Sequence, residues 1–264
     1  MTSSSISGGV APSVTVTGLP GLPLFQPGDD LAGAIADGVA AAGLGLQDGD
    51  VLVVAQKVVS KVEGRLVALA GVEPGASARA AAAKADKDPA VLQLVEQESS
   101  EIMRVAPGVV IVRHRSGQVL ANAGIDASNI SHEGGERVLL WPADPDASAA
   151  RLRRALEARF GIKLAVIVSD SLGRAWRMGT TGTAIGVSGL RPIRDRRGET
   201  DLFGRTLIAT VIGVADEIAA AASLVMGEAT EGLPAAIVRG ATYVRDETAG
   251  VGEIVRPLAQ DLFR

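Results

Sequence analysis

The sequence contains no cysteine and only two histidines, His114 and His132, among its 264 residues. The absence of cysteine excludes disulfide bonds, thiolate metal sites and a cysteine nucleophile. Two histidines are too few for the common catalytic zinc sites, so any metal is expected to be a hard cation bound by carboxylates. Aromatic residues make up only 3% of the chain while 47% is hydrophobic, so Ala, Val, Leu and Ile must fill the core of a folded globular protein.

The sequence has neither an excess of positive charge nor a membrane-spanning run. Its net charge of -4 argues against a general nucleic-acid binder, and the basic cluster at 194–197 is either solvated surface or an anion-binding loop. The apolar segment 208–226 is interrupted by Asp216 and Glu217. Residues 1–13 are rich in Ser and Gly but lack a basic start and an apolar core, which predicts a flexible tail and not a signal peptide. We therefore expect a cytoplasmic protein with no membrane or nucleic-acid partner.

Strands and helices alternate irregularly along the rest of the chain. Apolar residues at four-residue spacing predict two amphipathic helices, one through Leu31, Ile35 and Val39 and one through Leu152, Leu156 and Phe160. We expect strands at 14–17, 51–54, 138–141 and 235–238, a β-hairpin at 109–121, and further helices at 77–88, 89–103 and 206–226. Because steady βαβ alternation is missing, the pattern indicates an α+β fold with mixed sheets and packed helices.

The stretch Lys163–Arg174 is an apolar run followed by an acid, a hydroxyl, a glycine and an arginine. Such a run predicts a buried strand, and polar groups at its end would be held rigidly while facing open space. The oxygens of Asp170 and Ser171 suit Mg²⁺ or Mn²⁺, and Arg174 could hold a phosphate or carboxylate of a substrate. The alternative is a strand followed by an Asx turn that only opens the next segment.

Other signals are weak when taken singly, and no Walker A or GxGxxG sequence is present. The segment 179–186, rich in Gly and Thr, is either a phosphate cradle or a close-packed loop. Asp126 and Asn129 could point at one ligand or form a turn, and Lys57 and Lys61 could bind phosphate or be solvated. Together, the candidates supply the acids and the cation that metal-assisted phosphoryl transfer needs. They are Lys61, Asp126, Asn129, Asp170, Ser171 and Glu228.

Five motifs occur in the order found in one known family. They lie at 21–25 (GLPLF), 53–65 (VVAQKVVSKVEGR), 122–129 (NAGIDASN), 168–174 (VSDSLGR) and 227–232 (GEATEG). From about residue 14 to the end, the chain resembles the coenzyme F420-0:L-glutamate ligases. The resemblance implies one ligase domain over 14–264, with room for two subdomains, in a family-specific fold that forms an intertwined homodimer. It leaves open a stand-alone enzyme or the N-terminal module of a longer protein.

The resemblance also implies an activity. The family adds L-glutamate to the lactyl phosphate tail of a deazaflavin, coenzyme F420-0, using GTP, and extends the tail with γ-linked glutamates. The expected cations are Mg²⁺ or Mn²⁺ at two sites, with K⁺ as a further candidate. Amide formation needs an activated carboxylate, which an acyl phosphate made from GTP would supply, so no residue need be a covalent nucleophile.

By resemblance, Asp126, Asp170, Ser171 and Glu228 match metal-binding positions. The matching GTP-binding positions are Leu22, Pro23, Leu24, Phe25, Gln56, Lys61, Asn129, Met226, Gly227, Glu228, Ala229, Thr230, Glu231, Gly232 and Leu233. At the position of Gln56 some relatives carry Ser, which puts that contact in doubt. Two alternatives remain: a non-catalytic nucleotide or deazaflavin binder, and a metal-dependent phosphohydrolase. Crowded carboxylates are costly to keep without a cation, which argues against the first.

Overall fold

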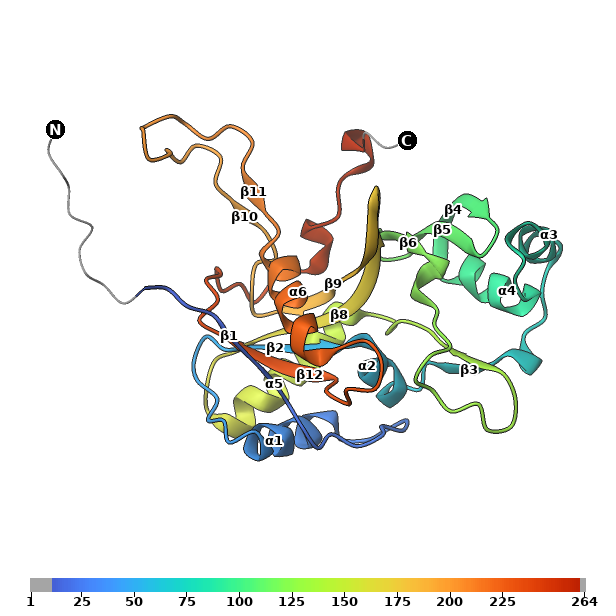
Figure 1. Ribbon diagram of the computed structural model, residues 1–264, viewed down its shortest axis with the longest axis horizontal. Helices are drawn as coiled ribbons and strands as arrows, with labels where there is room; N and C mark the ends of the chain where they lie inside the picture. Colours follow the sequence, from blue (N-terminus) through green and yellow to red (C-terminus); the bar gives the residue numbers. More distant parts are fainter. Residues whose placement is uncertain (1–10, 262–264) are drawn as a thin grey trace, which may run out of the picture.

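Five strands form a mixed sheet at the centre of the molecule (Figure 1). The computed structural model describes residues 11–261, and every structural statement below concerns that part of the chain. In spatial order the strands are β1 (Thr15–Gly18), β12 (Ala235–Arg239), β2 (Val51–Ala55), β8 (Ala165–Arg174) and β9 (Arg177–Ser188). The β2–β8 pair is parallel and the other neighbouring pairs are antiparallel. The sheet is apolar at its centre because helices cover both of its faces.

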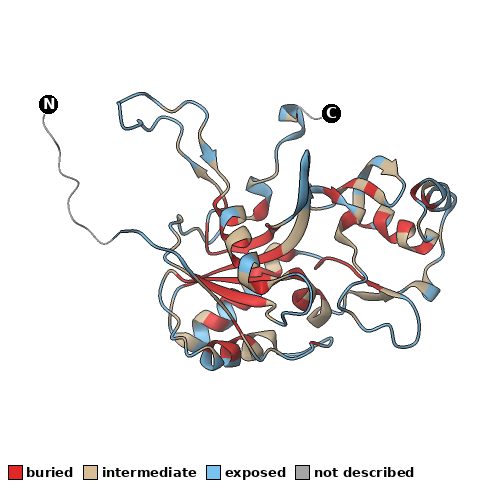
Figure 2. Ribbon diagram, in the orientation of Figure 1, coloured by how far each residue is buried: buried red, intermediate tan, exposed pale blue. Residues whose placement is uncertain are grey.

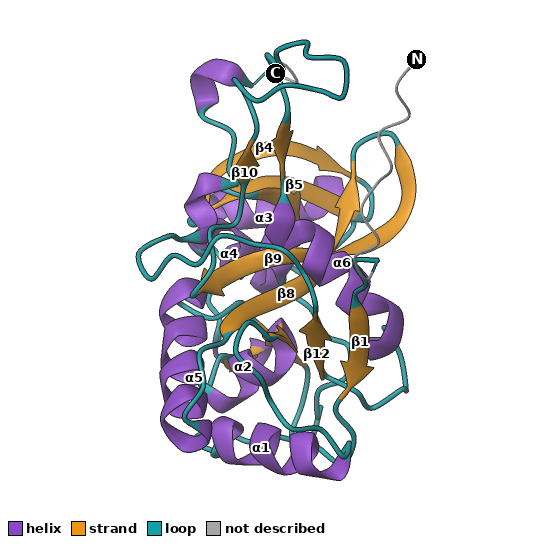
Figure 3. Cartoon of the chain, turned by 90° about the vertical axis from the view of Figure 1, so that its left-hand side faces the viewer, coloured by secondary structure: helices purple, strands orange, loops and turns teal. Residues whose placement is uncertain are grey.

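Helices pack on the two faces of this sheet (Figure 3). On one face lie α1 (Leu31–Ala41) and α5 (Pro145–Phe160), whose first turns are capped by Asp30 and Asp144. The two predicted apolar stripes are confirmed, since they join one core with β2 and β8. The other face is covered by α6 (Val214–Met226). A short helix, α2 (Gln56–Val62), follows β2 directly.

A second lobe is inserted between α2 and α5, on the right of Figure 1. Its elements are β3 (Leu66–Ala68), α3 (Ala76–Ala85), α4 (Pro89–Gln97), β4 (Ser99–Ala106), β5 (Val109–His114), β6 (Val119–Ala121) and β7 (Arg137–Leu139). The antiparallel β4–β5–β6 sheet and the helices α3 and α4 enclose a separate small core. The predicted hairpin at 109–121 is confirmed, and the combination of helices with mixed sheets agrees with the α+β expectation.

The strand formed by the central apolar run ends later than its sequence predicts. Sequence pattern predicts that the strand ends at Asp170, but β8 continues to Arg174 and pairs with β9 along its whole length. The segment 179–186 is therefore part of a strand and not a loop. Glycine is required there by close approach: a Cβ on Gly182 would lie 2.5 Å from the Ala219 carbonyl oxygen of α6. Gly182 and Gly186 therefore serve packing of the strand against α6 and against Pro145, the first residue of α5.

Two predicted helices are longer than the observed ones. The helix expected at 89–103 ends at Gln97, because the following residues form β4 and pair with β5. The helix expected at 206–226 begins only at Val214, after Gly213. Long-range strand pairing overrides the local apolar pattern in the first case, and in the second a glycine interrupts it.

A long hairpin projects from the body between β10 (Arg194–Asp195) and β11 (Val211–Ile212), and we call residues 194–212 the arm (Figure 1). Figure 2 shows the arm as almost wholly exposed. Leu202 and Phe203 at its tip are 99% and 96% exposed. The basic cluster near its base forms ion pairs with acidic neighbours within the arm, which favours the solvated-surface interpretation. No helix in residues 11–261 is both long and apolar enough to cross a bilayer. Residues 1–10 of the predicted tail lie outside the described residues.

Candidate functional site

A cavity of about 710 Å³ opens where β2 and β8 run toward α2 and the loops beyond α6, and we call it the central cavity. Loop 22–27, the start of α2, loop 129–137, the segment 169–171 of β8 and loop 226–234 all contribute to its wall. Because β2 and β8 are parallel neighbours and Ala55 at the end of β2 is paired with Ser169, the start of α2 and residues 170–171 of β8 meet at one place. The cavity has the size typical of small-molecule sites.

The structure places nearly all the expected site residues around this cavity. The nucleotide candidates that line it are Leu22, Pro23, Leu24, Phe25, Gln56, Lys61, Asn129, Met226, Gly227, Glu228, Ala229, Thr230, Glu231, Gly232 and Leu233. The metal candidates Asp170 and Ser171 line it as well. Asp126 does not line the cavity but is paired with Lys57, which does. Arg174 lines a separate hollow. The binding roles of these residues stay predictions.

Lys61 and Asn129 together link α2 to two of the loops that form the cavity. Its Nζ donates to the backbone oxygen of Asn129 at 2.7 Å. Asn129 has a left-handed backbone, φ 54°, and its side-chain amide donates to the Ala229 oxygen at 3.3 Å. Burial, followed by the neighbouring Lys57 charge, lowers the pKa of Lys61. An ammonium group that is partly stripped of water beside a second cation is well suited to receive an anion.

Gln56 is buried at the start of α2, and its contacts are with protein groups. Its Nε2 donates to Ser60 Oγ at 2.6 Å and to the Leu140 oxygen at 3.3 Å. The amide nitrogen is thus already engaged, and only the amide oxygen remains for a ligand. This geometry adds to the doubt that the sequence raises about a nucleotide contact at Gln56.

Asp170 is the most deeply buried acid of the site. Its Oδ2 accepts a hydrogen bond from Trp141 Nε1 at 2.8 Å, and its Oδ1 accepts one from the Ser171 N–H at 2.8 Å. Burial raises the pKa of Asp170, these two hydrogen bonds and the Lys57 charge lower it, and Asp126 raises it; the net effect is a raised pKa. A carboxylate in this position is held rigidly, and a nearby cation would favour its ionised form.

Asp126 is neutralised within the protein by Lys57. The two side chains form an ion pair, and the Ser128 N–H and hydroxyl each donate to the Asp126 carboxylate at 2.8 Å. Burial raises the pKa of Asp126, but Lys57 and Ser128 more than compensate, so the pKa is lowered. Asp126 therefore carries its charge already paired, whereas the charge of Asp170 lacks a direct ionic partner within residues 11–261.

The donor set at Asp170 and Ser171 fits a hard divalent cation. Both residues offer oxygen ligands, and the buried Asp170 carboxylate forms no direct ion pair within residues 11–261, so such an ion would supply one. Within residues 11–261, however, no three acidic or histidine side chains lie close enough together to hold a metal ion. Glu228 lines the cavity without joining such a cluster, and Asp126 would have to share its carboxylate with Lys57.

Two features of the site are not found by sequence reasoning. Trp141 lies 29 residues before Asp170, and only its need for an indole hydrogen-bond acceptor hints at such a partner. Lys57 has no counterpart in the resemblance, yet it forms the ion pair that positions Asp126. Arg174, expected to contact a substrate anion, faces a separate groove on the other side of the cavity wall.

Taken together, the fold and the cavity define an α+β protein whose site combines lysines for an anion with acidic oxygens suited to a hard cation. The sequence model of the F420-0:gamma-glutamyl ligase family matches residues 21–240. The chain is 45% identical over 253 residues to the coenzyme F420:L-glutamate ligase of Methanothermobacter thermautotrophicus, which covers 95% of this chain and 99% of that protein. Proteins of the same name from Methanopyrus kandleri (41% identity, 97% and 100% covered) and Archaeoglobus fulgidus (43%, 95% and 96%) are also similar. The chain belongs to the F420-0:gamma-glutamyl ligase family.

Proposed function

We propose that the chain is a ligase of F420 biosynthesis that uses GTP to join L-glutamate to the lactyl phosphate tail of coenzyme F420-0, and that it then adds γ-linked glutamates. The observation that carries the proposal is the central cavity, around which five separate segments bring the nucleotide candidates together with Asp170 and Ser171. Relatives with 41–45% identity over nearly their whole length carry the name coenzyme F420:L-glutamate ligase, which supports the ligase part of the proposal.

The reaction divides into two displacements. A carboxylate oxygen of the acceptor attacks the γ-phosphorus of GTP, GDP leaves, and an acyl phosphate forms. The glutamate amine then attacks the acyl carbon, phosphate leaves, and the amine loses a proton to solvent, which completes the amide. In the first step Lys61 offsets charge on the transferring phosphoryl group, and the loop at 226–233 holds the nucleotide.

Asp170 and Ser171 would hold a Mg²⁺ or Mn²⁺ ion, with Asp126 and Glu228 as candidate further ligands and K⁺ as a candidate additional cation. When bound, such ions neutralise phosphate charge and align the nucleotide. Within the protein, Trp141 fixes the orientation of the Asp170 carboxylate, and Lys57 with Ser128 fixes that of Asp126. Preorganised groups of this kind spare the reaction the reorganisation that water would need.

The test is incubation of the protein with GTP, Mn²⁺, L-glutamate and the unglutamylated deazaflavin, followed by mass spectrometry of the product. Addition of glutamate residues to the deazaflavin is the expected result. Release of phosphate from GTP without a ligated product would favour the phosphohydrolase instead. Binding of GTP and deazaflavin without turnover of either would favour the non-catalytic binder.

The proposal includes a homodimer. Leu202, Phe203 and Ile208 of the arm are large apolar side chains that are at least 81% exposed. A protruding hairpin with an apolar tip gains stability if the tip packs on a second subunit. A second copy of this chain is the partner that we propose for the arm, as the resemblance to intertwined dimers implies.

A further inference from the structure

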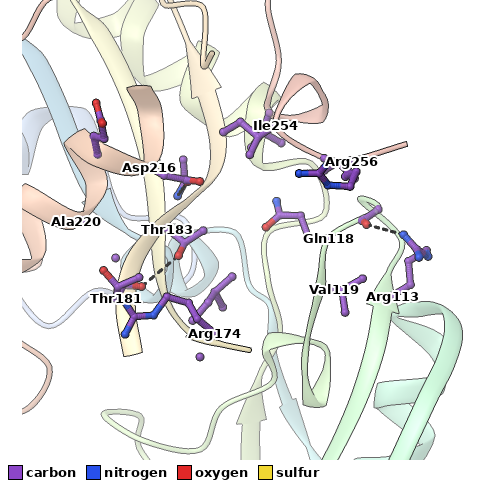
Figure 4. A pocket seen from close by; sticks show the side chains of 18 of the residues that line it. Arg113, Gln118, Val119, Arg174, Thr181, Thr183, Asp216, Ala220, Ile254 and Arg256 are labelled. Carbon is purple, nitrogen blue, oxygen red and sulfur yellow. Dashed lines mark hydrogen bonds between the residues drawn. The ribbon is translucent and has the colours of Figure 1, made fainter. Parts of the chain in front are cut away.

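A second hollow of about 610 Å³ lies beside the central cavity, and we call it the side groove. Its walls come from β8 and β9, the β5–β6 turn, the first turns of α6 and residues 251–256 (Figure 4). Arg113, Gln118 and Arg256 lie on one side of the view, and Arg174 and Thr181 lie on the other. None of the nucleotide candidates lines this groove, so its chemistry needs its own account.

Two donor atoms in the side groove, Gln118 Nε2 and Arg113 Nη2, have no hydrogen-bond acceptor in residues 11–261. Gln118 Nε2 is buried and has no hydrogen-bond partner in residues 11–261. Arg113 Nη2 is buried as well and makes no hydrogen bond there, but the Arg113 guanidinium is ion-paired with Glu101 at 3.5 Å and with Asp261 at 3.8 Å. Buried donors without acceptors are costly, so such donors in an open groove indicate a ligand rich in acceptor oxygens.

Two other guanidinium groups of the groove, unlike that of Arg113, carry positive charge without an ion pair in residues 11–261. Among residues 11–261, Arg174 donates only to backbone oxygens, those of Met178 at 3.4 Å and Gly179 at 3.5 Å, and Arg256 is exposed at the groove edge. Neither forms an ion pair with a carboxylate in the described part of the chain. Planar guanidinium groups bind phosphate and carboxylate oxygens in bidentate fashion, so the groove is suited to an anion.

The groove also contains acidic side chains, but these either interact with other protein groups or lie exposed at its edge. Asp216 accepts a hydrogen bond from the Ala184 N–H at 2.9 Å, and Glu217 is exposed on the same turn of α6. Asp261 faces Arg113. Between the charged ends, the wall is apolar; its apolar side chains are Val119, Leu172, Ala184, Ala220, Val251, Ile254 and Val255. A small, fully polar ligand would leave this wall unused, whereas a ligand with an apolar body would cover it.

The side groove and the central cavity are neighbours on the same two elements. Ser171 lines the central cavity and the next residue, Leu172, lines the groove. On α6, Ala220 lines the groove and Ser223 lines the cavity, a rise of about 4.5 Å along the helix. Gly182 borders both. A ligand seated in the groove would therefore need only a short tail to reach the groups at Asp170 and Ser171.

We propose that the side groove binds the acceptor of the reaction, an organic anion with a flat apolar ring system and a phosphate tail. The apolar wall takes the ring, and Gln118 with the arginines takes oxygens of the tail. This assignment rests on the proposed function for the identity of the acceptor. It makes the groove separate from the GTP site and gives Arg174 a role toward the acceptor and not toward the nucleotide.

The test measures binding without turnover. The deazaflavin acceptor, F420-0, is titrated by calorimetry into the parent protein and into Gln118→Leu and Arg256→Gln, in the absence of GTP. Each variant is expected to bind the acceptor about tenfold more weakly, the loss typical of one hydrogen bond to a charged group. GTP affinity is expected to stay unchanged. Arg154→Gln removes the same charge from the exposed face of α5 and serves as the matched control.

Equal acceptor affinity in parent, Gln118→Leu and Arg256→Gln would overturn the proposal. So would a parent protein that does not bind the acceptor, or variants whose affinity for L-glutamate falls while acceptor affinity is kept, since the groove would then hold the amino acid. Because Arg256 is exposed, its substitution does not threaten folding, and thermal unfolding of each variant checks this. A parent that binds the acceptor in the groove but yields no ligated product would overturn the proposed function and leave the groove assignment standing.

Discussion

Replacing Asp170 by asparagine tests the cation site with little change in volume. In the parent, the two carboxylate oxygens of Asp170 accept one hydrogen bond each, from Trp141 Nε1 and the Ser171 N–H. An asparagine has only one oxygen, so one of these N–H groups would face an amide NH₂. The substitution also removes a buried negative charge. We expect Asp170→Asn to abolish ligation and to leave the fold intact.

The expected magnitudes separate the structural role of Asp170 as a hydrogen-bond acceptor from its proposed role as a cation ligand. Leaving one buried N–H without an acceptor costs about 1–3 kcal/mol, and removal of the buried charge offsets part of this. A cation at 100 times its dissociation constant stabilises the parent by about 2.7 kcal/mol. For a chain of this size, that corresponds to a rise in Tm of about 5–10 °C. The rise should be absent in Asp170→Asn.

The assay is thermal unfolding as a function of Mn²⁺ at constant GTP, together with the mass-spectrometric ligation assay. Asp37→Asn is the matched control, because this side chain is 83% exposed on α1. It should keep both the Mn²⁺-dependent rise and full turnover. An Asp170→Asn protein with parental turnover and the parental Mn²⁺ response would refute the assignment of Asp170 as a cation ligand.

Three further predictions follow from named contacts. Lys61→Ala should raise the KM for GTP about tenfold, and more than Lys57→Ala does, because Lys57 is already paired with Asp126; equal effects would contradict this assignment. Burial alone would raise the pKa of Glu98, but His114, Arg65 and Arg115 hold it at about 2 against a usual 4.5. Stability from Glu98 is therefore complete above pH 4.5 and lost as the pH falls toward 2, by about 3 kcal/mol, and acid denaturation of Glu98→Gln should lack this component. Phe203→Ser should shift a dimer toward monomer in light scattering at micromolar concentration, and a monomeric, fully active parent would exclude the proposed dimer.

The fold is predictable from sequence where local pattern and tertiary environment agree. The stripe through Leu31, Ile35 and Val39 packs in the main core as its spacing predicts. The segment after Gln97 is different. It forms a strand because it pairs with β5, and its own residues do not predict this. The length of β8 likewise depends on its pairing with β9, and nothing in the apolar run itself predicts that pairing.

The site is predictable in composition but not in its pairings. Asp170 and Ser171 stand out because polar groups follow a buried strand, and the structure places both at the central cavity. The partners that influence the charge state of Asp170 come from distant parts of the chain: Trp141 from the segment before α5, and Lys57 from the helix after β2. Residue type alone cannot show that Asp126 is neutralised and Asp170 is not, since this depends on which cation lies within reach.

The continuation of β8 past Asp170 changes how the chemistry of the site is held. If the strand ended there, Asp170 and Arg174 would lie on a loop and could move independently. In the structure both are in one strand whose partner, β9, is held against α6 by the close approach at Gly182. A single rigid ribbon thus presents Asp170 and Ser171 to one hollow and Arg174 to the next. In a reaction that joins a phosphoryl donor to a separate acceptor, such a ribbon fixes the distance between the two proposed binding sites, because both are built on the same pair of strands.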